Sequence, residues 1–123
     1  MPPVYPKSNI ALLDSRVVAI TWAFLALLAV SWLGAHLVPV AAHVVFQANF
    51  VLFCLFATAH VILSFQHKCP ACGKHPTIQG FKPVHPNSVH QSALSGWAGV
   101  IMNVLRRRRL VCIHCGSEYI IQR

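Results

Sequence analysis

A long run without charge dominates the first half of this chain. Between Arg16 and Lys68 the sequence contains no Lys, Arg, Asp or Glu, and most of its residues are apolar. A water-soluble chain of 123 residues has too small an interior to bury such a run in one core. The run therefore predicts membrane-spanning helices, because the hydrocarbon core of a bilayer excludes charged side chains.

Pro39 divides this run into two stretches of spanning length. The first, 17–38, covers roughly 33 Å as a helix, which is enough to cross a bilayer core. The second, 44–65, follows after the short segment Pro39–His43, so we expect an antiparallel helical hairpin. A cleavable signal peptide ending at Val40–Ala42 is the alternative. Its apolar region would exceed the roughly 7–15 residues usual in such signals, and its basic flank is weak.

Positive charge flanks the two stretches on one side only. Lys7 and Arg16 precede the first stretch, and Lys68 and Lys74 follow the second, whereas the turn between them has no Lys or Arg. The positive-inside tendency then predicts that both termini lie on the cytoplasmic side of the membrane. We expect this membrane to be a bacterial-type inner membrane or a plasma membrane.

The second stretch carries polar side chains on two opposite stripes of its helical wheel. One stripe holds Gln47, Cys54 and Thr58, and the other holds Asn49, Phe53, Phe56 and His60. If one stripe faces the first helix, the other meets lipid or protein, and lipid is costly for Asn49 and His60. These two residues therefore predict an integral membrane partner or self-association. The alternative is that both form hydrogen bonds within the hairpin.

Two cysteine turns follow the apolar stretches, Cys69-Pro-Ala-Cys72-Gly73 and Cys112-Ile-His-Cys115-Gly116. In a C-x2-C-G turn two thiolates converge, and the glycine lets backbone amides point at sulfur. Four soft ligands suit one tetrahedral Zn²⁺ per chain, with iron as the second choice. The segment between the turns is longer than in common zinc patterns, but loop closure tolerates this because its cost rises slowly with length. Four unrelated buried or disulfide-bonded cysteines are the alternative.

The two turns, with the short strands expected beside them, resemble the zinc-ribbon superfamily over Lys68–Arg123. The resemblance implies a small β domain that binds metal through Cys69, Cys72, Cys112 and Cys115. Rubredoxins bind iron with similar paired turns, although they are typically acidic and this segment is basic. Zinc ribbons bind nucleic acid, dock on proteins or serve as scaffolds, so the resemblance does not define one function.

The segment between the cysteine turns predicts three elements of its own. We expect a short strand at 77–82, a turn-rich loop at 83–88 and a short helix at 93–105. Two further β-prone runs lie at 109–112 and 118–123.

The expected helix combines an apolar face with a basic run. Trp97, Ile101 and Leu105 recur at helical spacing, and four arginines follow at once, Arg106, Arg107, Arg108 and Arg109. This combination predicts contact with anionic lipid headgroups or a protein partner. The alternative is that the apolar face packs beneath the metal site while the arginines are solvated.

Together these features predict a membrane protein with a two-helix transmembrane hairpin and a small β zinc-ribbon domain that contains an inserted amphipathic helix. We expect an irregular cytoplasmic arm at 1–16, the hairpin at 17–66 and the ribbon at 67–123. The formal charge is +8, or about +6 once four thiolates hold a divalent ion.

The residues favour a non-enzymatic protein. The sequence shows no Ser/His/Asp set, phosphate-binding glycine loop or carboxylate pair, and four cysteine ligands leave a metal no open position. We expect an accessory or structural subunit of a membrane protein complex, with no small-molecule substrate. The alternatives are rubredoxin-like electron transfer through iron and a membrane-tethered nucleic-acid-binding ribbon.

Overall fold

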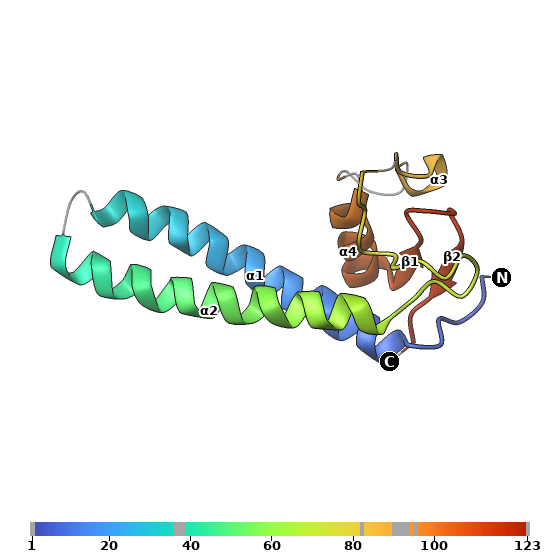
Figure 1. Ribbon diagram of the computed structural model, residues 1–123, viewed down its shortest axis with the longest axis horizontal. Coiled ribbons are helices and arrows are strands. Elements are labelled where there is room, and N and C mark those ends of the chain that lie inside the picture. The colour runs from blue at the N-terminus through green and yellow to red at the C-terminus, as the bar shows by residue number, and fades with distance from the viewer. Residues whose placement is uncertain (1, 36–38, 82, 90–93, 95, 123) are drawn as a thin grey trace. The chain divides into compact units, whose positions relative to one another are not determined.

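The computed structural model describes residues 2–35, 39–81, 83–89, 94 and 96–122 (Figure 1). Its elements in order are α1 (Ser8–Ala35), α2 (Pro39–Gln66), α3 (Pro86–Val89), α4 (Gly96–Arg107), β1 (Arg109–Val111) and β2 (Glu118–Ile120). They form two compact units. One is Val17–Val61, and the other combines Met1–Arg16 with Ile62–Arg123.

The two long apolar helices predicted from the sequence are confirmed. Ser8–Gly34 and His43–Gln66 have mean hydropathies of 2.1 and 2.0, and each is long enough to cross a membrane. The predicted end of the first stretch, 36–38, lies outside the described residues. α2 begins at Pro39 rather than at residue 44, because proline is tolerated in the first turn of a helix, where its missing N–H has no intrahelical partner.

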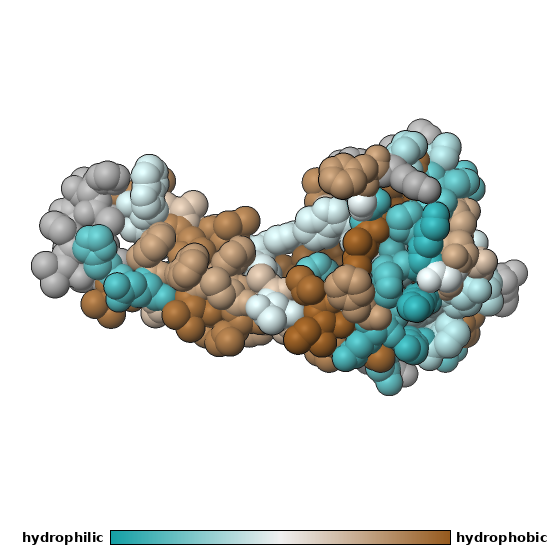
Figure 2. Space-filling view, viewed as in Figure 1, coloured by the Kyte–Doolittle hydropathy of each residue, from teal (hydrophilic) through white to brown (hydrophobic). Residues whose placement is uncertain are grey.

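Within the unit Val17–Val61, aromatic stacking joins α1 to α2. The rings of Phe24 and Phe56 stack with their centroids 5.5 Å apart and their planes 19° from parallel. Most other large side chains on both helices point outward, and Figure 2 shows hydrophobic surface along them.

This stacking shows which polar stripe of α2 faces α1. Phe56 belongs to the stripe of Asn49 and His60, and all three side chains are half-buried. Gln47, Cys54 and Thr58 form the other stripe, where the Thr58 hydroxyl donates to the carbonyl of Cys54 at 2.8 Å. The arrangement favours contacts of Asn49 and His60 within the hairpin, and their contact with another protein stays a prediction.

The second unit contains a small two-stranded sheet, and the N-terminal segment of the chain pairs with it. β1 and β2 pair antiparallel with Leu110 opposite Tyr119. Val4 forms a parallel bridge with Ile120, whose amide donates to the carbonyl of Pro3 at 2.9 Å. The N-terminal segment therefore lies along the free edge of β2, near the label N in Figure 1.

Two expectations about local structure in this unit are wrong. The strand expected at 77–82 does not form in the described residues 77–81, because His114 binds the carbonyls of His75 and Ile78 and holds this segment as a loop. The loop expected at 83–88 includes the first residues of the four-residue helix α3.

The described residues of the N-terminal segment, 2–16, are not an irregular arm either. α1 begins at Ser8, whose hydroxyl donates to the carbonyl of Tyr5 at 2.6 Å. Tyr5 is 1% exposed, and Ala11 and Leu12 also join the core of this unit. Asp14 lies inside α1, and it is completely buried. The N-terminal segment is thus part of the fold that carries the cysteines.

Candidate metal centre

The two cysteine turns have the same backbone geometry. The amide of Gly73 donates to the carbonyl of Cys69 at 2.8 Å, and that of Gly116 donates to the carbonyl of Cys112 at 2.9 Å. Both glycines have φ near +70°, a left-handed conformation that disfavours residues with a Cβ. At Gly116 a Cβ would also overlap the ring of His85.

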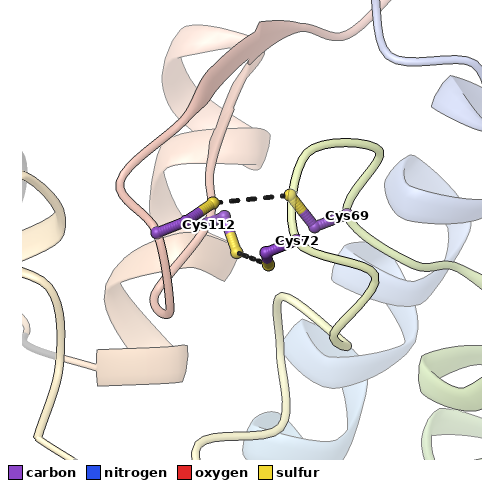
Figure 3. A group of neighbouring side chains, drawn as sticks. Cys69, Cys72 and Cys112 are labelled. Atoms are coloured by element: carbon purple, nitrogen blue, oxygen red, sulfur yellow. Dashed lines mark hydrogen bonds between the residues drawn. The ribbon is translucent and has the colours of Figure 1, made fainter.

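The turns bring four sulfur atoms together. Sγ of Cys69 lies 3.7 Å from Sγ of Cys115, and Sγ of Cys72 lies 3.7 Å from Sγ of Cys112. All four sulfurs are within 4.8 Å of one another. Figure 3 shows the labelled cysteines with their sulfurs turned toward the same point. This is the cluster that the spacing of the cysteines predicted.

The distances fit a metal and not disulfides. Four sulfurs each about 2.3 Å from a tetrahedral Zn²⁺ are separated from one another by about 3.8 Å. A disulfide would require about 2.05 Å between sulfurs. An iron–tetrathiolate centre would use the same four ligands, so the geometry indicates a four-cysteine metal site without choosing its metal.

The thiols differ in their tendency to lose a proton. Burial raises the pKa of Cys112, although the backbone amides of His114 and Cys115 act in the opposite direction. Burial also acts to raise the pKa of Cys115, but hydrogen bonds with the Ser117 side chain and backbone, together with those to Cys72 and Cys69, lower the pKa to about 7. Four buried or half-buried thiolates would repel one another, so a cation among them is the natural source of compensation.

Tyr119 supports one of the sulfurs. Its hydroxyl lies 3.7 Å from Sγ of Cys69, within the range for a hydrogen bond to sulfur. Burial, followed by this hydrogen bond, raises the pKa of Tyr119, so the hydroxyl stays protonated and can donate. The ring of Tyr5 packs edge-on against Tyr119 with the centroids 5.6 Å apart, which fixes its orientation. Through Tyr5, the N-terminal segment thus contributes to the packing around the cysteine cluster.

Histidines lie around the cysteine cluster but are not part of it. His114 donates from Nε2 to the carbonyls of His75 and Ile78, at 3.2 and 3.0 Å. His75 donates from Nδ1 to the carbonyls of Ser64 and His67, at 3.0 and 3.1 Å. These contacts join the turns and the insert to the end of α2.

Sequence reasoning missed a buried polar pair beside the first cysteine turn. Nε2 of His67 lies 3.2 Å from Oδ2 of Asp14, and the hydroxyl of Ser64 lies 3.4 Å from the same oxygen. Nδ1 of His67 is buried without a hydrogen-bond partner in the structure as described. An acidic residue next to an apolar run was the available signal, but the sequence does not reveal its partner.

The helix expected at 93–105 is α4, and its apolar face belongs mainly to the core. Val100, Ile101 and Val104 are at most 2% exposed. Trp97 is 36% exposed, and Leu105 is half-buried. Ile101 therefore packs in the core, as in the alternative interpretation of this helix, and does not reach the surface. Trp97 remains accessible to a membrane or a partner.

The four arginines occupy different environments. Arg106 and Arg107 are exposed in the last turn of α4, where cations interact favourably with the helix dipole. Arg108 has a φ of 55°, and its carbonyl accepts from the amide of Ile121 at 2.8 Å. Arg109 pairs with Glu118 at 2.7 Å. The run is not one uniform basic patch.

Comparison of the chain with protein-family models, curated proteins and solved structures gave no match. The class of protein is therefore inferred from the fold and the cysteine cluster. Two long apolar helices precede a small region with few strands, and this region carries a cluster of four cysteines. The cluster fits a metal-binding module of the zinc-ribbon or rubredoxin type.

Proposed function

We propose that the protein is a membrane-anchored, non-enzymatic metal-binding subunit whose Zn²⁺ organises a small cytoplasmic domain. The observation that carries the proposal is the closed geometry of the four sulfurs, which are mutually within 4.8 Å. A Zn²⁺ with four cysteine ligands has no position for water or substrate, which is the arrangement of structural zinc sites.

The exposure of the two helices supports the membrane anchor. The core helix of a soluble protein has most of its apolar surface covered by its own chain. In α1 and α2 only 11% and 6% of the most apolar windows are buried. Large side chains such as Leu33 and Leu55, both 61% exposed, would face water without a bilayer or a partner. A bilayer removes this cost.

The division of the chain into two units supports the proposed role as an accessory subunit. One unit presents apolar helices, and the other is built around the cysteine cluster and exposes Trp97, Arg106 and Arg107 at its surface. Purification in mild detergent, followed by identification of co-purifying membrane proteins, tests this role. Recovery of the protein alone from native membranes argues against it.

The decisive experiment for the metal is elemental analysis of protein purified without chelator. We expect one zinc per chain, and replacement by Co²⁺ should give the visible spectrum of a tetrahedral tetrathiolate. Iron in that position, with visible absorption in the protein as isolated, would instead support the rubredoxin-like alternative. Absence of any metal would contradict both.

Topology is tested separately. In a Cys54→Ser background, His43→Cys introduces a thiol at an exposed position near the start of α2. A membrane-impermeant thiol reagent should label it in intact cells if both termini lie in the cytoplasm, as the positive-inside tendency favours. Labelling only after lysis would reverse the orientation.

A further inference from the structure

A cavity of about 380 Å³ lies between the segment that precedes α1 and the end of α2. All of its lining residues belong to the unit that carries the cysteines. They are Tyr5, Pro6, Lys7, Phe65, Gln66 and Lys68. Two lysines therefore line one cavity together with the aromatic residues Tyr5 and Phe65. Neither of the chain's two acidic residues, Asp14 and Glu118, lines it.

Lys7 is held at this cavity by the end of α2. Its Nζ donates to the backbone carbonyl of Gln66, the last residue of that helix. Carbonyls in the last turn of a helix lack intrahelical partners and attract cations. An ammonium group has three N–H donors, so two remain for a ligand.

Lys68 is fixed through its backbone. Its carbonyl accepts a 2.8 Å hydrogen bond from the hydroxyl of Tyr5, whose side chain is 1% exposed. The Lys68 side chain itself is exposed. A buried tyrosine thus sets the position from which this second ammonium group extends.

Phe65 supplies the apolar part of the cavity. Its side chain is 60% exposed, and it continues the exposed apolar surface of α2 at Val61 and Ile62. The ring of His75 packs edge-on against it with the centroids 5.2 Å apart. Phe65 lies one residue from the end of α2, where a spanning helix would leave the hydrocarbon core.

We propose that this cavity binds the headgroup of an anionic phospholipid of the membrane in which the helices are anchored. Lys7 and Lys68 contact the phosphate, and Phe65 packs against the glycerol and the upper acyl chain. The inference rests on the proposed membrane anchor. A lipid matches both the basic and the apolar parts of the cavity. Its headgroup offers negative charge to the two lysines, and its chains offer apolar surface beside Phe65.

The test compares phosphatidylglycerol with phosphatidylcholine. Full-length protein is purified in detergent, and retained lipids are measured by native mass spectrometry. In the double variant Lys7→Gln/Lys68→Gln we expect the preference for phosphatidylglycerol to fall about tenfold, because each cation near an anionic surface contributes to binding. The double variant Lys7→Arg/Lys68→Arg should keep most of the preference.

The charge-matched control is Arg106→Gln/Arg107→Gln, which removes two exposed cations from α4. This variant should lose less than about threefold of the preference if the cavity is specific. An equal loss in both Gln variants would overturn the site and assign lipid preference to overall basicity. Displacement of phosphatidylglycerol by millimolar inorganic phosphate would overturn the lipid and indicate a free phosphate ligand.

Two readouts separate this proposal from the proposed function. Metal content reports whether each variant keeps its folded cysteine cluster, and extraction of membranes with alkaline carbonate reports whether the helices are inserted. Retained metal and insertion with unchanged lipid preference would reject the cavity alone. Release of the unmodified protein by carbonate would reject the membrane anchor itself.

Discussion

The carboxylate of Asp14 lies 3.2 Å from Nε2 of His67, and neither side chain has any exposed surface. Asp14 belongs to α1, whereas His67 directly follows α2 and stands two residues before the first cysteine of the cluster. The pair connects the start of one apolar helix to the segment that leads into the metal site. The nearby hydroxyl of Ser64 makes the burial of the carboxylate less costly.

Breaking this pair should be strongly destabilising. We expect Asp14→Asn to cost about 2 kcal/mol of unfolding free energy, because an amide replaces the carboxylate that meets two buried polar groups, those of His67 and Ser64. The matched control is Glu118→Gln, which removes the exposed pair with Arg109 and should cost less than about 1 kcal/mol. Hydrogen exchange at the amides of β1 and β2 measures both. Equal effects of the two substitutions would contradict the importance of the buried pair.

Removing one metal ligand should unfold the small domain. Cys112→Ser leaves three thiolates, and metal binding supplies much of the folding free energy of a domain of this size. We expect loss of bound zinc and of hydrogen-exchange protection in β1 and β2, with the helices still inserted. Cys54→Ser is the control, since Cys54 is exposed on α2 outside the cluster. Normal zinc content in Cys112→Ser would refute its role as a ligand.

Metal affinity should fall as the pH falls. Burial raises the pKa of Cys112, so this thiol is protonated at neutral pH in the absence of metal, and metal must displace its proton. Cys115, with a pKa of about 7, is already partly ionised there. Each displaced proton weakens the apparent affinity by about tenfold per pH unit. Competition with a chelator at about pH 6, 7 and 8 measures the slope, and a flat profile would exclude buried thiols as ligands.

The apolar face of α4 provides a test of packing against surface contact. Ile101 is 0% exposed, so Ile101→Ala should leave a cavity and cost about 3 kcal/mol of unfolding free energy. Trp97→Ala, at a side chain that is 36% exposed, should cost clearly less. Thermal loss of the Co²⁺ spectrum ranks the two variants. The reverse order would mean that Ile101 is not a core residue.

Patterns that are local along the chain could be read from the sequence. The uncharged run between Arg16 and Lys68 determined two long apolar helices, because helix formation and exclusion of charge depend on neighbouring residues. The C-x2-C-G spacing determined two turns whose sulfurs converge, because the glycine and the short spacing fix the backbone of each turn.

Other features depended on contacts between distant residues. Tyr5 and Tyr119 pack together, Val4 bridges to Ile120, and Asp14 meets His67, although each pair is separated by many residues. The hydrophobic periodicity of the sequence does not indicate which distant residues will pair. Residues 1–16 were therefore expected to be an irregular arm. The strand expected at 77–82 does not form for the same reason, since the distant His114 binds the carbonyls of His75 and Ile78.

The orientation of amphipathic faces was also decided by tertiary structure. A helical wheel shows that Asn49 and Gln47 lie on different stripes and that Ile101 lies on an apolar face, but it does not identify what each face meets. Stacking of Phe24 on Phe56 turned the Asn49 stripe toward α1, and the core of the cysteine-bearing unit took up Ile101. The physical reason is that burial is a property of the packed chain, in which the covering side chains come from other elements.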